Sequence, residues 1–253
     1  MKIQQDPSRG FRKIEKLPHG VHIGFIYENI NDLLQAVSLF FKFGLERNEM
    51  CLWALHKGLT LSKAKAVLKK TIKDLDKKID IGQIKFKNHK EWHVEGENFD
   101  VSMAIKNLNS EGVEAFHNGW NGLRVSGNPL EFNIHWDVLR KYEETATQTL
   151  HKHKIIALCA YPANQLSLNK MIEIVNSHPF TLTRKGSAWV IEENLTLNSI
   201  RTIKRDLKIK IKDLQKFKNL SINRELKMVE LKQKIQNLKN KLKRYKNARE
   251  NKN

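Results

Sequence analysis

The pattern of apolar and polar positions predicts that strands and helices alternate along most of the chain. Short apolar runs bounded by polar residues predict strands at 21–27, 50–55, 81–87, 122–127 and 155–162. Apolar residues spaced three and four apart predict helices at 31–45, 59–73, 99–116, 129–150 and 165–177. Two further short strands after His178 read as an edge hairpin through Lys185-Gly186. This alternation predicts an α/β fold, with a mostly parallel sheet covered by helices on both faces.

From about Leu195 the pattern changes to that of one long helix, rich in lysine and free of glycine and proline. Its second half carries apolar residues at heptad spacing: Met228, Leu231, Ile235, Leu238 and Leu242. We predict a C-terminal helix or coiled coil with an interruption at residues 219–223. A lone helix of this kind needs a partner, so we expect a homodimer; one helix folded back on the domain is the alternative.

The expected organisation has three parts: a flexible lead-in at 1–17, an α/β domain at 18–194 and a basic helical tail at 195–253. The net charge of +19 is concentrated in the tail, where residues 197–253 hold 19 Lys+Arg and 5 Asp+Glu. Such a helix could contact nucleic acid nonspecifically through its phosphates. The lysines could instead keep a coiled coil soluble or pair with an acidic partner.

No apolar run approaches the roughly 18 residues that a membrane span requires, and the first 20 residues lack a signal-peptide core. We therefore expect a cytoplasmic protein that does not enter a membrane. Its two cysteines, Cys51 and Cys159, lie inside apolar runs, which is typical of buried, reduced thiols.

The first strand, helix and second strand resemble the start of a nucleotide-binding domain, yet the connecting turn lacks phosphate chemistry. Residues 28–35 contain no Gly, Lys, Ser or Thr, and Glu28 and Asp32 would repel a phosphate. We expect no nucleotide hydrolysis and no cofactor. A degenerate ATPase that still binds nucleotide stays an alternative.

The histidine pairs predict neither a metal site nor a catalytic site. The close pairs are His19 with His22, His89 with His93, and His151 with His153. None has acidic or cysteine partners at a metal-binding spacing, and no nucleophile–base arrangement is evident. We therefore expect no metal and no enzyme. His178-Pro179 reads as a turn.

Aromatic residues near strand ends favour a pocket for a small, apolar ligand beyond the carboxyl ends of the strands. Ordinary core packing is the alternative. The candidate ligand-binding residues are His22, Tyr27, Trp53, His56, Arg124, Trp136 and Tyr161. Trp92 and Phe132 belong to the same set of aromatics.

A series of short motifs in order resembles the MEDS domain, the methanogen/methylotroph DcmR-type sensory domain, over residues 18–194. The motif residues are His22-Ile23, Phe41, Gly44-Leu45-Glu46, Glu49-Met50-Cys51-Leu52, Gly122-Leu123-Arg124-Val125-Ser126-Gly127, Tyr142-Glu143, Cys159-Ala160-Tyr161 and His178-Pro179. The sequence departs from the pattern at Gly24, where many members have Cys, and at Asn48, where many have Gly. The first departure speaks against a thiol-based role at that strand.

The resemblance implies a RecA/KaiC-like fold that has lost its phosphate loop and has been reused to sense small hydrocarbon-derived compounds. It implies an archaeal or methylotroph-type regulator, because the family occurs beside DNA-binding domains and histidine kinases. We expect a non-enzymatic sensor that signals through its C-terminal helix to a separate signalling or transcription partner. The alternative is a transcription-related regulator that contacts nucleic acid through the basic tail.

Overall fold

The computed structural model describes residues 9–88, 91–92, 94–95, 98–129, 134–186 and 188–250. The chain divides into two compact units, Met1–Asn198 and Ser199–Asn253. The first is an α/β domain and the second is most of one long helix. The predicted α/β class with a long C-terminal helix is confirmed.

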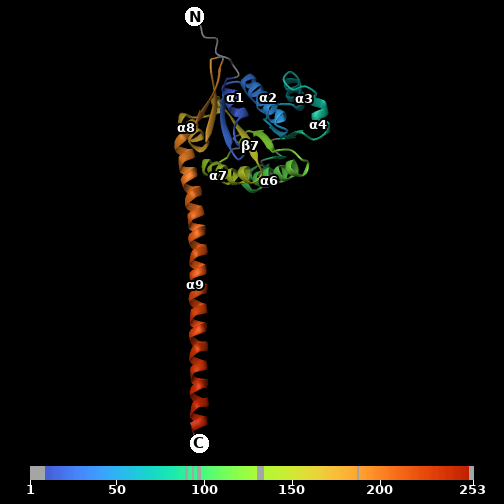
Figure 1. Ribbon diagram of the computed structural model, residues 1–253. Helices are drawn as coiled ribbons and strands as arrows, with labels where there is room; N and C mark the ends of the chain where they lie inside the picture. Colours follow the sequence, from blue (N-terminus) through green and yellow to red (C-terminus); the bar gives the residue numbers. More distant parts are fainter. Residues whose placement is uncertain are drawn as a thin grey trace. The chain divides into compact units, whose positions relative to one another are not determined.

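A seven-stranded sheet forms the centre of the α/β domain (Figure 1). Its order is β3-β2-β6-β7-β1-β8-β9, and every pairing is parallel except that of β8 with β9. The strands are β1 (His22–Tyr27), β2 (Met50–Leu55), β3 (Ile84–Asn88), β6 (Leu123–Gly127), β7 (Ile155–Pro162), β8 (Phe180–Lys185) and β9 (Ala188–Glu193). A separate antiparallel pair consists of β4 (Val94–Glu95) and β5 (Asn98–Phe99). The predicted edge hairpin is present as β8 and β9.

Helices cover both faces of this sheet, as the continuous apolar strands predict (Figure 1). One face packs against α1 (Arg9–Glu15), α2 (Ile30–Glu46), α3 (Leu61–Lys69) and α4 (Leu75–Asp80). The other packs against α6 (Val101–His117) and α7 (Trp136–Lys152). A short 3₁₀ turn, η2 (Ala163–Gln165), and helix α8 (Leu168–Ser177) follow β7. Ile174 of α8 lies over Gly24 of β1, so α8 covers the same face as α7.

The expected flexible lead-in is wrong for residues 9–17. Helix α1 lies there, with Phe11 and Ile14 fully buried, and Phe11 packs edge-on against Trp189 at 5.2 Å between ring centroids. Apolar residues three apart, at Phe11, Ile14 and Leu17, give this short segment a buried face. Residues 1–8 lie outside the described part of the chain.

The helix expected at 59–73 is α3, and a second short helix that was not expected, α4, follows beyond that range. Helix α3 ends at Lys69, and α4 starts after Asp74, whose φ of 55° is left-handed and cannot continue a helix. The helix expected from residue 129 begins at Trp136 in the structure. Both differences leave the mostly parallel sheet unchanged.

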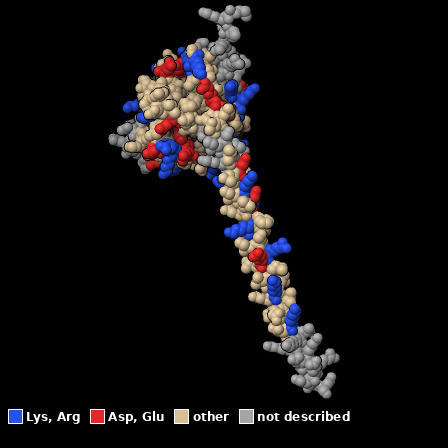
Figure 2. Space-filling view, turned by 90° about the vertical axis from the view of Figure 1, so that its left-hand side faces the viewer, with Lys and Arg blue, Asp and Glu red and all other residues tan. Residues whose placement is uncertain are grey.

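Helix α9 (Leu195–Glu250) runs without the interruption expected at 219–223. Polar residues there are compatible with a helix, and no glycine or proline breaks it. The seam residues Met228, Leu231, Ile235 and Leu238 are 44–65% exposed, and the side chain of Leu242 lies outside the described residues. Basic side chains outnumber acidic ones along the described part of the helix (Figure 2). Within the described residues, no helix has the length and apolar character needed to cross a membrane.

Candidate functional site

The turn after β1 caps its own helix and holds no phosphate cradle. The Asn29 side chain accepts hydrogen bonds from the backbone N–H groups of Asn31 and Asp32, which are the groups that an anion would use. Asp32 forms an ion pair with Arg184. The chain itself therefore occupies these two N–H groups and pairs the Asp32 carboxylate.

A buried polar group lies instead on the sheet face that α7 and α8 cover. We call it the Glu143 cluster: His22 on β1, Glu143 on α7, Cys159 on β7 and His178 just after α8. The register places Gly24 opposite Cys159, and alternation along the strands puts His22, Gly24 and Cys159 on one face. Four segments that are distant in sequence thus meet at one point.

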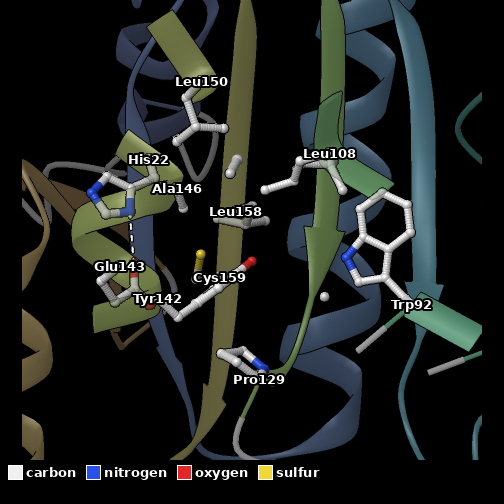
Figure 3. A pocket seen from close by; sticks show the side chains of 13 residues that line it. His22, Trp92, Leu108, Pro129, Tyr142, Glu143, Ala146, Leu150, Leu158 and Cys159 are labelled. Atoms are coloured by element: carbon white, nitrogen blue, oxygen red, sulfur yellow. Dashed lines mark ion pairs between the residues drawn. The ribbon is translucent and has the colours of Figure 1, made fainter. Parts of the chain in front are cut away.

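The carboxylate of Glu143 organises this cluster. Its Oε2 lies 3.0 Å from Nδ1 of His22 and 3.7 Å from Nε2 of His178 (Figure 3 shows the first contact). Its Oε1 accepts a hydrogen bond of 2.9 Å from the Tyr161 hydroxyl. The two imidazole rings lie 4.5 Å apart between centroids.

The remaining contacts show which ring nitrogen of His178 carries hydrogen. Nδ1 of His178 lies 2.8 Å from the Ile174 carbonyl oxygen, which can only accept, so Nδ1 carries the proton. Nε2 of His22 faces the Thr147 hydroxyl at 3.5 Å, and this hydroxyl donates to the Glu143 carbonyl. A neutral His178 then turns the lone pair of its Nε2 towards the Glu143 carboxylate.

Burial and these neighbours shift several pKa values. Burial alone would raise the pKa of Glu143, but His178, His22 and the Tyr161 hydroxyl together lower it to about 2. Burial, and then the Glu143 charge, raise the pKa of the Cys159 thiol. The same two causes raise the pKa of Tyr161. The cluster therefore holds one negative charge that needs positive charge beside it.

A small cavity of about 20 Å³ adjoins the cluster beneath α7 (Figure 3). A single water needs about 10–15 Å³ on this measure, so the cavity holds one or two water-sized groups. Its polar lining is His22, Glu143 and Cys159, and the rest is mostly apolar. The cavity lies between the face of the sheet and a helix, and it reaches the carboxyl end of β6 at Gly127 and Pro129.

Gly24 makes room for this arrangement. A Cβ atom at Gly24 would lie 3.0 Å from Cγ of His178 and 3.3 Å from Cγ2 of Ile174. Any side chain there would press on the His178 ring. The departure from the family pattern at Gly24 therefore leaves space for that ring.

The structure brings together only part of the predicted ligand set. His22 and Tyr161 both contact Glu143. Trp92 lines the cavity, while Phe132 lies outside the described residues. Trp136, near the start of α7, has Lys170 over its ring and does not line the cavity.

The other four candidates lie away from the Glu143 cluster. Trp53 is fully buried against Phe41 and Phe86, as ordinary core packing predicts. Tyr27 packs with the core on the α2 face and has His56 at 6.2 Å between ring centroids. His56 therefore lies away from His22, which pairs with His178 on the opposite face.

Arg124 belongs to a second buried group, which we call the Glu49 cluster: His19, Arg47, Glu49 and Arg124. Nε of Arg124 donates to Glu49 Oε2 at 2.5 Å, and its Nη1 donates to the Phe40 carbonyl at 3.1 Å. Glu49 Oε1 lies 2.8 Å from His19 Nε2 and 3.2 Å from Arg47 Nε. Glu49 and Arg124 are fully buried, so this cluster ties α2, β2 and β6 together.

Sequence reasoning missed Glu143, Cys159 and His178 as site residues. It assigned Cys159 to the core and His178 to a turn, and it looked for metal ligands among histidines close in sequence. The signal was nonetheless present, since all three stand in the motifs Tyr142-Glu143, Cys159-Ala160-Tyr161 and His178-Pro179. Among the described residues, one ligand atom from each member of the Glu143 cluster lies within 4.8 Å of the others, a spacing that a metal ion can use.

Three comparisons relate the chain to known proteins. Among solved structures, the flagellar accessory protein FlaH from Methanocaldococcus jannaschii is similar, with a TM-score of 0.46 and 12% identity over 71% of this chain and 80% of that one. No curated protein matches the chain. The family model for the MEDS domain (MEthanogen/methylotroph, DcmR Sensory domain) matches residues 21–179, which contain the whole Glu143 cluster. This match covers more than half of the 253 residues, and the chain therefore belongs to the MEDS family.

Proposed function

We propose that this protein is a non-enzymatic sensor that binds a small ligand beside the Glu143 cluster and signals through α9. Membership of a sensory-domain family indicates a sensory or signalling role. The observation that carries the proposal is the cavity beneath α7, where His22, Glu143 and Cys159 face an otherwise apolar lining. A few convergent polar groups in an apolar pocket are typical of a binding site.

The size of the cavity favours sensing over turnover. It holds only one or two water-sized groups, so a larger apolar ligand enters only if α7 or its side chains move. A ligand that favours the displaced arrangement shifts the protein towards it. Binding and conformational change are then one event, as a sensor requires.

A short covalent and hydrogen-bonded route joins the cluster to the start of α9. Pro179 follows His178, and its carbonyl accepts a hydrogen bond of 2.9 Å from the backbone N–H of Asn194. The Asn194 side chain donates to the Val175 carbonyl of α8 at 3.3 Å. Asn194 directly precedes α9, so displacement of His178 reaches the first turn of that helix.

A thermal-shift screen of the full chain tests the proposal, using one- to three-carbon alcohols and haloalkanes. We expect at least one compound to raise the melting temperature through preferential binding to the folded state. The variant Ala146→Leu fills the cavity and should abolish that shift, because Ala146 lines it. Val138→Leu, on the exposed side of α7, is the matched control and should retain it. A shift that survives Ala146→Leu would contradict binding at this cavity.

A second candidate function is nucleic-acid binding through the tail. The tail holds 19 basic and only 5 acidic residues, which favours contact with phosphates. Such binding weakens linearly with the logarithm of salt concentration. Anisotropy of a labelled DNA duplex, titrated with the full chain at several salt concentrations, tests it. Binding without a salt slope would exclude this role for the tail.

A further inference from the structure

The Glu143 cluster has the composition of a transition-metal site. Two imidazoles, one thiol and one carboxylate are the ligand types found in zinc and related sites. A calcium or magnesium site would need oxygen ligands almost throughout. We propose that the Glu143 cluster binds one divalent transition-metal ion, such as Zn²⁺. This proposal deepens the proposed function. The metal site itself is argued independently, and only its part in signalling rests on the proposed function.

The distances are close to those that a four-coordinate site needs. With metal–nitrogen bonds of about 2.0 Å and metal–sulfur bonds of about 2.3 Å, tetrahedral ligand atoms lie roughly 3.3–3.8 Å apart. Here Glu143 Oε2 lies 3.0 Å from His22 Nδ1 and 3.7 Å from His178 Nε2. All four ligand atoms lie within 4.8 Å of one another. Side-chain shifts of about 1 Å complete the geometry.

The lone pair of His178 also points the right way. The Ile174 carbonyl holds the proton of His178 on Nδ1, which turns the Nε2 lone pair towards Glu143. His22 places Nδ1 3.0 Å from the same carboxylate, and metal binding there requires that Nδ1 carries no proton. Two ring nitrogens and a carboxylate that converge in this way need a cation between them, and that cation is a proton or a metal ion.

The outer contacts match those around bound metals. A histidine ligand typically donates its other N–H to a carbonyl, as His178 does to Ile174. A carboxylate ligand is typically held by a further hydrogen bond, as the Tyr161 hydroxyl holds Glu143. Metal binding replaces the Cys159 Sγ–H proton, which passes to the buffer, with a metal–sulfur bond. The metal would then face the cavity, since His22, Glu143 and Cys159 line it.

Cobalt titration of the full chain tests the site directly. The chain is stripped with a chelator, dialysed and titrated with Co²⁺ alone, and absorbance is recorded. We expect one Co²⁺ per chain, a thiolate-to-cobalt charge-transfer band and tetrahedral ligand-field bands. Cys159→Ser should remove the charge-transfer band. Cys51→Ser is the matched control and should keep it, because Cys51 belongs to the core on the opposite face.

One further variant separates metal binding from folding. Tyr161→Phe removes only an outer contact and should weaken Co²⁺ binding about 10- to 100-fold. Circular dichroism confirms that each variant is folded. Absence of cobalt uptake, or a charge-transfer band that persists in Cys159→Ser, would overturn the metal site and leave protons as the cations. If the metal-loaded protein instead binds none of the small ligands in the thermal-shift screen, the proposed sensing is overturned and the metal site is not.

A separate observation concerns the partner of α9. The seam residues Met228, Leu231, Ile235 and Leu238 occupy a and d positions of a heptad repeat. All positions beside this seam, e and g, are lysine: Lys227, Lys232, Lys234, Lys239, Lys241 and Lys246. The first four have exposed side chains in the structure.

Pairing of two copies would bring these lysines together. In a parallel coiled coil, g of one helix faces e of the next heptad on its partner, which places Lys227 against Lys232 and Lys234 against Lys239. An antiparallel pair would place lysine against lysine as well. Upstream, Asp213 and Lys218 occupy the corresponding positions and would attract, so the conflict is confined to the C-terminal half.

We infer that this half of α9 binds an acidic amphipathic helix rather than a second copy. The apolar seam requires an apolar face on the partner, which a DNA duplex does not offer, and the flanking lysines require Glu or Asp. The expected homodimer therefore becomes the competing outcome. It remains measurable by light scattering of the full chain.

Two labelled peptides, each with leucine at a and d, test the inference. One carries Glu at e and g and the other carries Lys. We expect the Glu peptide to bind the full chain at least tenfold more tightly, with the difference shrinking at high salt. The double variant Lys232→Glu/Lys239→Glu creates Lys–Glu pairs between two copies and should convert a monomer into a dimer. A wild-type dimer at low salt, equal binding of both peptides, or binding of a DNA duplex in preference to the Glu peptide would overturn the inference.

Discussion

Two carboxylates are buried on opposite faces of the same sheet, and the groups around them differ. Glu49 lies among Arg124, Arg47 and His19, and two of these are permanent cations. Glu143 lies between His22 and His178, whose charge depends on a proton, with Tyr161 and Cys159 nearby. The first carboxylate is neutralised by the chain itself. The second needs a cation that can be exchanged.

The two clusters draw on one set of family motifs. Gly44, Glu49 and Arg124 come from motifs that hold α2 against the sheet, because Gly44 leaves room for the Arg124 side chain. His22, Glu143, Cys159 and His178 come from motifs that converge on a cavity. A residue that belongs to a family motif can therefore either hold the fold together or belong to the Glu143 cluster.

The largest loss of stability is expected when the Glu49 cluster is broken. Glu49→Gln leaves the buried Arg124 guanidinium without its counter-charge, and this should lower the free energy of unfolding by about 3–5 kcal/mol. Glu143→Gln leaves histidines that can remain neutral, so its cost should be only about 1 kcal/mol. Urea unfolding of both variants measures the difference. Equal losses would show that the two clusters do not differ in this way.

Two glycines give a steric version of the same comparison. In Gly44→Ala the new Cβ would lie 2.6 Å from Cδ of the buried Arg124, so we expect a loss of about 1–3 kcal/mol. In Gly24→Ala the contact with His178 Cγ is 3.0 Å and less severe, so stability should fall less while Co²⁺ binding weakens. Thermal unfolding and cobalt titration of each variant give the two readouts. Weakened cobalt binding in Gly44→Ala alone would reverse the assignment.

The pH dependence of stability sharpens the comparison further. Burial would raise the pKa of Glu49, but hydrogen bonds and charge from His19, Arg124 and Arg47 lower it below its ordinary 4.5. Because the folded pKa lies below the unfolded one, this stabilisation is present above pH 4.5 and is lost as the pH falls through the folded pKa. The stability gap between wild type and Glu49→Gln should therefore narrow in acid. Urea unfolding at neutral and acidic pH measures it, and a gap that widens would contradict the argument.

The smallest effect belongs to a carboxylate on the surface. Glu230 and Lys227 of α9 form an exposed ion pair of 3.6 Å. Water and salt screen such a pair, so Glu230→Gln should change the unfolding free energy by less than about 0.5 kcal/mol. The same urea experiment provides the measurement, and a larger loss would mean that the pair is buried by a partner.

The sequence predicted the strands and the mostly parallel sheet well because buried parallel strands leave continuous apolar runs. The strands at 50–55 and 155–162 are observed at those bounds. Some helix boundaries depend on the backbone φ angle of a single residue, such as the left-handed Asp74. Such an angle leaves no trace in the apolar periodicity of the sequence. The buried helix α1 was missed because its two buried apolar residues, Phe11 and Ile14, stand in a polar segment.

The site was harder to predict because its residues are assembled by tertiary structure. His22 and Tyr161 were expected, yet Glu143 lies on a helix face and His178 follows a helix end, where each has a common structural explanation. Arg124 and Trp53 were expected at the same site but occupy the other face. Alternation assigns residues of one strand to two faces, but only the packed helices show which face carries chemistry.

The position of β1 in the sheet has a consequence during synthesis on the ribosome. This strand lies between β7 and β8, and Ile155 follows Tyr27 by 128 residues. At translation rates of about 5–20 residues per second, the apolar strand waits on the order of ten seconds for its first neighbour. Until then His22 lacks Cys159 and His178, and the nascent chain presents an unpaired strand to chaperones.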